Sequence, residues 1–251
     1  MLVRSLTLMY HAVSDGWNDP LAVRTADFRR QLASLVARGY RGASAADVLA
    51  RPGDRRLLHV TFDDAYASVT NAIGPMRELR IHSTIFVCTD FADEGRRLEI
   101  PELGRVADRD ELRTLSWDEL RELVRDELVE VGSHTKSHAH LPELSDAELD
   151  AELRQSREAI EDHLGARAPF LAYPFGEEDE RVRRAAERAG YAGAFAAPGA
   201  SFRTGPYRLP RTGLWRDEPP ERQRTKTRYA VRIAAELNYP LRRYLKRRRE
   251  G

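Results

Sequence analysis

The feature of this sequence that most restricts its fold is a repeated alternation between short apolar runs and longer amphipathic stretches. The short runs are rich in β-branched and aromatic residues, which indicates strands. The longer stretches place apolar side chains at helical spacing, for example over residues 27–38. Six strands are predicted, at residues 6–10, 57–62, 85–87, 129–132, 170–173 and 194–196. The strand–helix order continues about seven times, which predicts a largely parallel α/β fold.

Two motifs mark where helices begin. Ser116 and Ser145 are each followed three residues later by a glutamate, which is the capping-box pattern. We therefore predict one helix that runs to about residue 127 and a second that ends at Gly165. A third helix is predicted over residues 179–189.

Length and composition favour one soluble domain. The chain has 251 residues, of which 41% are hydrophobic and 32% charged, and no apolar run approaches the ~20 residues that span a bilayer. Residues 1–10 turn polar too early for a signal peptide, so we expect a cytoplasmic protein. The single cysteine, Cys88, excludes an internal disulfide and a thiolate metal cluster, and its apolar surroundings predict a core position. The charged segment 90–114 is predicted to be a long loop.

Charge is distributed unevenly along the chain. Residues 221–251 hold eleven Lys and Arg against three Glu, a charge of +8, which leaves −7 for residues 1–220 because the total is +1. We therefore predict a folded domain over 1–220 and a basic helix or tail over 221–251. Such a tail can contact anionic lipid, at ~1 kcal/mol per basic residue, or remain solvated. Nucleic acid is not an expected partner, because no recognition fold or interleaved aromatic residues accompany the charge.

Polar residues follow several of the predicted strands directly. Asp63 and Asp64 follow one strand, His134 follows another, and Phe175 follows a third. In α/β barrels the carboxyl ends of the strands converge on one mouth, so we expect these residues to meet. Two adjacent carboxylates at a buried strand end need a compensating cation, although a helix cap would also explain one of them.

His134 and His138 provide the partners for such a cation. Their i, i+4 spacing predicts two imidazoles on one side of a helical turn, and one aspartate completes a two-histidine, one-carboxylate set for a divalent ion. Zinc is the default, but non-haem iron oxygenases use the same set, so the ligands alone leave the reaction open. His140 lies two residues further and should point elsewhere. The remaining histidines outside the candidate site are interpreted as structural: His59, His82 and His163.

Three motifs together resemble one known family. They are Thr-Phe-Asp-Asp at 61–64, Ser-His-Thr-x-x-His-x-x-Leu at 133–141 and Tyr-Pro-Phe-Gly at 173–176. In this order they resemble the polysaccharide deacetylase (NodB-homology) family, carbohydrate esterase family 4, over about residues 5–215. The resemblance implies a distorted (β/α)7 barrel. It also implies metal-dependent removal of acetyl groups from N-acetylhexosamines, with Zn²⁺ or alternatively Co²⁺, Ni²⁺ or Mn²⁺.

The resemblance also implies roles for individual residues. Asp63 is the expected general base, and Asp64 is the expected metal ligand beside the two histidines. Phe175 is expected to donate its backbone N–H to the oxyanion, in a tight turn of the substrate-binding segment that includes Tyr173 and Pro174. Arg211 is expected to pair with Asp63 and keep it ionised, with a surface position as the alternative.

Two departures from the family pattern raise the question of activity. Ala65 stands where the family usually has glycine, and no histidine follows His163, whereas many members have a catalytic histidine near the C-terminus. His11, directly after the first strand, is the candidate acid that protonates the leaving amine. Its Tyr-His context resembles the branch that acts on poly-N-acetylglucosamine.

Two other functions remain open at this point. A catalytically silent carbohydrate-binding member would also explain the departures, and a phosphoesterase would usually gather more ligands for two metals. Of the tryptophans, Trp215 is a candidate for stacking on a sugar ring, and Trp117, inside a capping box, is predicted to be core.

Overall fold

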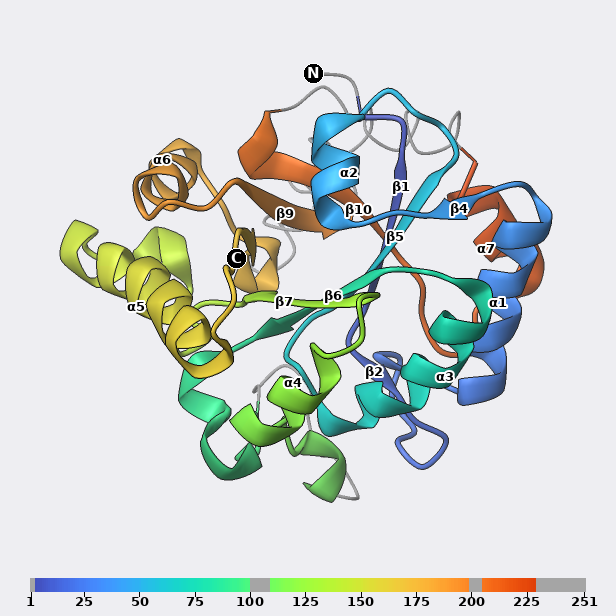
Figure 1. Cartoon of the computed structure of the whole chain (residues 1–251), viewed down its shortest axis with the longest axis horizontal. Helices are drawn as coiled ribbons and strands as arrows, with labels where there is room; N and C mark the ends of the chain where they lie inside the picture. The colour runs from blue at the N-terminus through green and yellow to red at the C-terminus, as the bar shows by residue number, and fades with distance from the viewer. Residues whose placement is uncertain (1–2, 100–108, 199–204, 229–251) are drawn as a thin grey trace, which may run out of the picture.

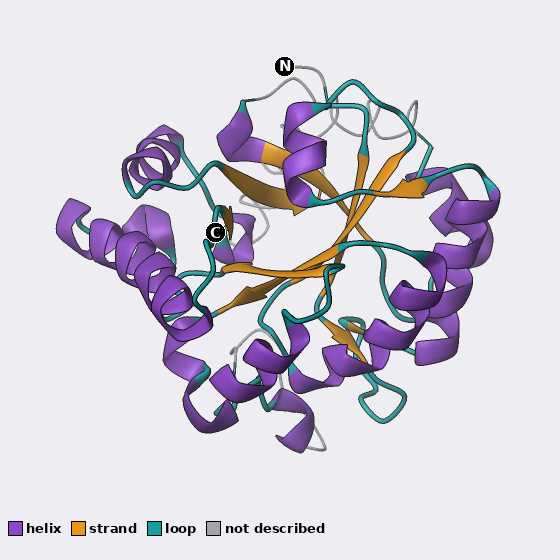
Figure 2. Ribbon diagram, viewed as in Figure 1, coloured by secondary structure: helices purple, strands orange, loops and turns teal. Residues whose placement is uncertain are grey.

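The computed structural model describes residues 3–99, 109–198 and 205–228, and its centre is a closed ring of parallel strands (Figures 1 and 2). Strand β1 pairs with β5 on one side and with β10 on the other, which closes the ring. The seven strands are β1 (Leu6–Tyr10), β5 (Leu57–Phe62), β6 (Ser83–Val87), β7 (Val129–Ser133), β8 (Phe170–Ala172), β9 (Gly193–Pro198) and β10 (Leu209–Gly213). This ring confirms the predicted seven-stranded barrel.

The ring is irregular in several places. Strands β7 and β8 share a single register pair, Ser133 with Leu171, and the β9–β10 register shifts near Arg211. A short strand β4 (Arg41–Gly42) pairs with the start of β5 beside the ring. Strands β2 (Ala12–Val13) and β3 (Ala22–Val23) form a separate pair after β1.

Helices surround the barrel (Figure 2). They are α1 (Thr25–Ala37), α2 (Ala45–Ala50), α3 (Thr70–Leu79), α4 (Trp117–Leu123), α5 (Asp146–Leu164), α6 (Glu180–Arg188) and α7 (Pro220–Lys226). Both predicted capping boxes are present, and α5 ends at Gly165 in the left-handed conformation, at φ 63°. Helix α4 ends four residues before the predicted position, because Asp126 takes up the following turn by accepting the N–H of Leu128.

Several elements were not predicted from the sequence. Gly74 and Pro75 resemble a helix breaker, yet both lie inside α3. Strand β10 contains Pro210 and Arg211, which interrupt the apolar pattern of a buried strand. The predicted loop 90–114 contains short 3₁₀ turns at Thr89–Phe91, Asp93–Gly95 and Arg109–Leu112, and its residues 100–108 lie outside the described ones.

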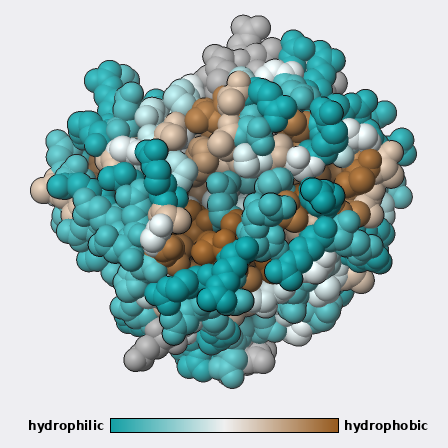
Figure 3. Space-filling view, viewed as in Figure 1, coloured by the Kyte–Doolittle hydropathy of each residue, from teal (hydrophilic) through white to brown (hydrophobic). Residues whose placement is uncertain are grey.

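The strands carry the core of the molecule. Strands β1, β5 and β6 are buried along their whole length, and the polar side chains of His59, Thr61 and Thr84 are buried with them. Hydrophilic residues cover most of the face in Figure 3, and apolar residues gather near its middle. Cys88 is buried, as predicted, and burial raises the pKa of its thiol.

The described chain ends on the barrel surface. Thr227, just after α7, is buried against α1 and accepts a hydrogen bond from Nη1 of Arg38 at 2.8 Å, while its carbonyl accepts one from Tyr40. The basic tail predicted to contact anionic lipid spans residues 221–251, and its residues 229–251 lie outside the described ones. Among the helices described, none combines the length and the apolar character needed to cross a bilayer.

Candidate active site

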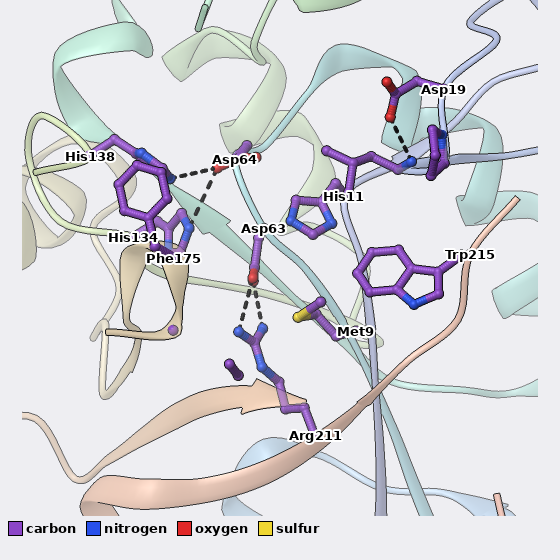
Figure 4. Close-up of a pocket in the computed structure, with 14 residues that line it drawn as sticks. Met9, His11, Asp19, Asp63, Asp64, His134, His138, Phe175, Arg211 and Trp215 are labelled. Carbon is purple, nitrogen blue, oxygen red and sulfur yellow. Dashed lines mark hydrogen bonds and ion pairs between the residues drawn. The ribbon is translucent and has the colours of Figure 1, made fainter. Parts of the chain in front are cut away.

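The carboxyl ends of the barrel strands bring the predicted polar residues together (Figure 4). His11 follows β1, Asp63 and Asp64 follow β5, and His134 follows β7. These four side chains line one cavity of about 490 Å³, a volume in the range of small-ligand sites. Of these four residues, His11 and His134 lie 123 positions apart in sequence and still share one mouth, as the barrel geometry predicts.

Asp64, His134 and His138 could hold a metal ion. Each offers one ligand atom, and these atoms lie within 4.8 Å of one another. Nε2 of His134 and Nε2 of His138 are 3.4 Å and 3.3 Å from Oδ1 of Asp64. Within the described part of the chain, both buried carboxylate oxygens of Asp64 lack a partner with hydrogen-bond geometry. A buried carboxylate in this state needs a cation, so the donor set fits a divalent ion.

The tautomer of His134 suits metal binding. Its Nδ1 lies 2.8 Å from the carbonyl oxygen of Ala172 and donates to it, which leaves Nε2 unprotonated and facing Asp64. Burial lowers the pKa of His134 to about 4, against the raising effect of Asp63 and Asp64. The imidazole is therefore neutral near pH 7, which is the form that binds metal.

The local structure around His138 differs from the prediction. The i, i+4 spacing was expected to act through a helical turn, but residues 134–140 form no helix. Thr135 and His138 instead adopt left-handed backbone conformations, at φ 68° and 64°. The prediction of a helical turn was wrong, because two reversals of the backbone, rather than helical periodicity, bring the second imidazole back to the first.

Glu152 on α5 holds this loop, and sequence reasoning missed it. Its Oε2 accepts the backbone N–H groups of Lys136 and Ser137, each at 2.9 Å, and its Oε1 accepts the hydroxyl of Ser137 at 2.7 Å. A glutamate in the middle of a charged helix carries no sequence signal that distinguishes it from a solvated one.

Arg211 forms a buried bidentate pair with Asp63. Its Nη1 and Nη2 donate to the two carboxylate oxygens at 2.6 Å and 2.9 Å, and its Nε donates to the carbonyl of Ala196. Burial raises the pKa of Asp63, but the Arg211 guanidinium and neighbouring imidazoles outweigh it and hold this pKa below its usual value. Asp63 is therefore ionised and fixed in orientation beside the metal-ligating set.

His11 lies across the cavity from His138, between Asp63 and Trp215 (Figure 4). Its ring stacks on the indole of Trp215 at a centroid distance of 6.1 Å. Its buried Nδ1 has no hydrogen-bond partner among the residues described. The ring is thus positioned by packing, and His11 is one of the residues that line the cavity.

Phe175 occupies a strained turn at the rim of the cavity. Its φ is 56° and that of Gly176 is 65°. Its side chain is 36% exposed and packs between two imidazoles, parallel to His140 at 4.1 Å and edge-on to His138 at 4.5 Å. His140 does not belong to the metal-ligating set, because its Nδ1 pairs with Glu177 at 2.9 Å.

Other predicted residues lie outside the cavity. Tyr173 is fully buried and donates its hydroxyl to the carbonyl of Tyr207, and Pro174 is also buried. Neither lines the cavity, so the segment 173–176, which was expected to bind substrate, presents only Phe175 and Gly176 there. Trp117 is buried and stacks on His163, which matches its predicted core position.

Backbone strain is concentrated at this site. Seven described non-glycine residues have positive φ, and five of them adjoin the cavity: Asp64, Ala65, Thr135, His138 and Phe175. Such conformations persist only where the surrounding structure enforces them, and they cluster at functional sites. At φ 50°, Ala65 occupies a left-handed position that favours glycine, so alanine is tolerated there at some backbone strain.

Comparison with known proteins identifies the family. The family model described as polysaccharide deacetylase matches residues 50–194, more than half of the chain. This range includes Asp63 and the candidate metal ligands Asp64, His134 and His138. The chain belongs to the polysaccharide deacetylase family. His11 and Arg211 lie outside the matched range.

Individual relatives agree with this assignment. YxkH of Bacillus subtilis is 24% identical over 204 residues, which are 78% of this chain and 66% of YxkH. The chain thus spans slightly less than two thirds of the length of that relative.

Solved structures share the fold. BC0361, a polysaccharide deacetylase from Bacillus cereus, superposes with a TM-score of 0.73 at 23% identity, covering 89% of this chain and 69% of its own. The deacetylase PplD of Streptococcus pyogenes gives 0.74 at 21% identity, covering 91% and 100%. IcaB of Ammonifex degensii gives 0.70 at 21% identity, covering 92% and 97%.

Proposed function

We propose that this chain is a metal-dependent hydrolase that removes N-acetyl groups from N-acetylhexosamine units of a glycan or glycan precursor. The observation that carries the proposal is that a candidate metal site and a candidate general base lie in one cavity. An Asp-His-His set suited to one divalent ion lies beside an ionised aspartate that Arg211 fixes in place. The family assignment supports the deacetylase reaction class.

Asp64, His134 and His138 would hold the ion, most simply Zn²⁺, with Co²⁺, Ni²⁺ or Mn²⁺ as alternatives. When bound, such an ion supplies Lewis acidity and lowers the pKa of water. The neutral His134 and the ionised Asp64 are already in the protonation states that binding requires, since Asp64 has a lowered pKa despite its burial.

Asp63 acts as the general base. Water attacks the acetyl carbonyl carbon, and the Asp63 carboxylate takes its proton. Arg211 makes this step efficient in two ways, because it keeps the carboxylate ionised in a buried setting and locks its orientation through two hydrogen bonds.

Phe175 and His11 act in the later steps of the reaction. The backbone N–H of Phe175 donates to the oxyanion of the tetrahedral intermediate. Protonated His11 then transfers a proton to the amine nitrogen as the carbon–nitrogen bond breaks. The products are acetate and a free amino sugar.

Acetate release tests this function directly. The full-length chain, loaded with Zn²⁺ or Co²⁺, should release acetate from chitooligosaccharides or from acetylated amino-sugar precursors, and His11→Ala should slow release more than it weakens substrate binding. Metal bound at one equivalent with no acetate from any of these substrates would reject the proposal and favour a silent carbohydrate-binding protein.

A further inference from the structure

The part of the cavity wall formed by Asp19, Pro20 and Leu21 has no assigned role. Opposite His138, the cavity is lined by Asp19, Pro20 and Leu21 together with Trp215, and Figure 4 shows Asp19 on the side of His11 and Trp215. Asp19, Pro20 and Leu21 belong to the connection between β2 and β3, residues 14–21, which we call the wall loop.

Arg216 fixes the wall loop from the far end of the chain. Its Nη1 donates to the carbonyl oxygens of Ser14, Trp17 and Ala22 at 3.0, 2.8 and 2.9 Å, and its backbone N–H donates to the carbonyl of Pro20 at 3.0 Å. One residue thus contacts four points along the loop and its end. Because 194 to 202 residues separate Arg216 from these Nη1 acceptors, the clamp exists only when the barrel closes.

The guanidinium of Arg216 has little compensation from carboxylates. Its side chain is 6% exposed, and Nε lies 3.9 Å from an oxygen of Asp217, which is 64% exposed. Burying a cation among carbonyl dipoles is costly unless its hydrogen bonds are well formed. The hydrogen bonds from Nη1 to three carbonyl oxygens offset this cost and hold the loop in one geometry.

Further anchors make the wall loop rigid. Trp17 is 3% exposed and packs edge-on against Tyr66 at 5.1 Å. The hydroxyl of Ser14 donates to Glu111 at 2.7 Å and accepts the N–H of Gly16 at 3.1 Å. A β-carbon at Gly16 would lie 2.9 Å from the Glu111 carboxylate, so the backbone approach is already close.

Asp19 is the group that this rigid loop presents to the cavity. Its Oδ1 accepts the N–H of Leu21 at 2.8 Å, and its carbonyl accepts the N–H of Ala22 at 3.1 Å. Within the described chain its Oδ2 takes part in no hydrogen bond or ion pair, and the residue is only partly buried. A carboxylate held by one oxygen and open at the other is suited to accept hydrogen bonds from hydroxyl groups.

We propose that the wall loop is the sugar-recognition wall of this site. Asp19 is its specificity-determining residue, which accepts hydrogen bonds from hydroxyl groups of the hexosamine, and Arg216 is the positioning residue that holds Asp19 there. This inference rests on the proposed function for the identity of the sugar. On this inference, a polyhydroxylated acetamide is a better substrate than a small acetyl compound that lacks hydroxyl groups.

The test compares a sugar with a small acetyl ester. Tetraacetylchitotetraose carries the hydroxyl groups that Asp19 would bind, and 4-nitrophenyl acetate carries none. Asp19→Asn should lower kcat/KM at least about tenfold more for the tetrasaccharide than for the ester, mainly through KM, because one charge-assisted hydrogen bond is weakened. Asp15→Asn is the matched control, since Asp15 lies in the same loop, is exposed and does not line the cavity.

Arg216 variants test the positioning role. Arg216→Met should raise KM for the tetrasaccharide in the same direction as Asp19→Asn, and Arg216→Lys, which keeps donors near the carbonyls, should recover part of the loss. If Arg216 had a purely structural role, its variants would instead have a lower Tm and a lower kcat for both compounds, with no selective rise in KM for the tetrasaccharide. That result, or equal effects of Asp15→Asn and Asp19→Asn, overturns the inference.

A binding measurement separates this inference from the proposed function. Calorimetric titration of tetraacetylchitotetraose into the metal-loaded Asp63→Asn chain reports affinity without turnover, and adding Asp19→Asn should weaken it at least about tenfold. Binding with no acetate release from the unmodified chain would reject the proposed function and leave the wall loop supported. Acetate release with an affinity unaffected by Asp19→Asn would reject the wall loop alone, and absence of binding would reject both.

Discussion

The buried pair of Arg211 and Asp63 allows the electrostatics of the site to be tested in detail. Arg211→Met removes the guanidinium and keeps most of the aliphatic stem, so Asp63 retains its packing and loses two hydrogen bonds of 2.6 and 2.9 Å. Asp63 is 4% exposed, so solvent replaces those bonds poorly where it lies. The variant therefore leaves a buried negative charge without its main counter-charge.

The cost follows from the burial of both partners. Removing one partner of a buried ion pair destabilises a protein by about 3–5 kcal/mol, which is a large share of the ~5–15 kcal/mol of a typical domain. For a chain of this size each kcal/mol lowers Tm by about 2–4 °C, so we expect a decrease of roughly 6–20 °C. Adding Asp63→Asn removes both charges, and the double variant should be less destabilised than the sum of the single variants.

The same variant should change the pH dependence of activity. Arg211 opposes the effect of burial and lowers the pKa of Asp63, so its removal raises that pKa. The base works only when ionised, and activity is lost as pH falls through its pKa. The acid limb of kcat/KM should therefore move to higher pH in Arg211→Met.

The measurements are urea and thermal unfolding with saturating metal, and a pH profile of acetate release. Arg184→Met is a matched control, because Arg184 forms an exposed pair with Glu180 on α6 and should change stability by less than about 0.5 kcal/mol. A change in Tm of less than about 2 °C is what a surface substitution would give. If Arg211→Met shows so small a change and the acid limb of its kcat/KM profile does not move, the assigned role of the pair is wrong.

Four shorter predictions concern the rest of the molecule. Asp63→Asn should keep one equivalent of metal, measured by metal analysis, and lose about 10²–10⁴-fold in kcat; activity near normal would rule out its role as base. Chelation should abolish acetate release and lower Tm, and adding Zn²⁺ should restore both; release that persists after complete chelation contradicts metal dependence. Ala65→Gly should stay within about 1 kcal/mol of the unmodified chain in urea unfolding, whereas Ala65→Val should cost more than about 2 kcal/mol, because Ala65 is buried at positive φ. Burial lowers the pKa of His59, so the stability that its neutral form contributes is fully present above the unfolded pKa of about 6.5. The free energy of unfolding should therefore fall as pH drops below that value. His59→Gln should reduce the slope of this fall, and an unchanged slope would contradict the assignment to His59.

The location of the site could be predicted from the sequence because it depends on strand ends. Once residues 57–62 and 129–132 are recognised as buried strands, the barrel geometry places Asp63 and His134 at one mouth regardless of the intervening chain. The prediction needed only the order of elements and the residue types that follow them. It did not need the loop conformations, the helix ends or the register.

The residues that support the site could not be predicted in the same way. Glu152 and Arg216 act largely through backbone atoms of other segments, and almost every residue type presents the same backbone groups there. Arg216 reaches the wall loop only because the barrel closes β10 against β1. A contact that depends on closure leaves no local pattern in the sequence, in contrast to a capping box, whose two partners lie three residues apart.

The local geometry of the metal-ligating set shows why spacing alone misleads. A helical turn would have satisfied the backbone between His134 and His138 with its own hydrogen bonds. Here His138 adopts a left-handed conformation at an energetic cost of order 1–3 kcal/mol, as Asp64 does on the facing strand end. Both strained residues place candidate ligand atoms close to one another, and Glu152 holds the loop that carries His138. Such strain at two residues from separate segments is expected where the position of their side chains matters more than the local backbone energy. The backbone conformation therefore supports a cation site, and this support does not depend on the types of the ligand residues.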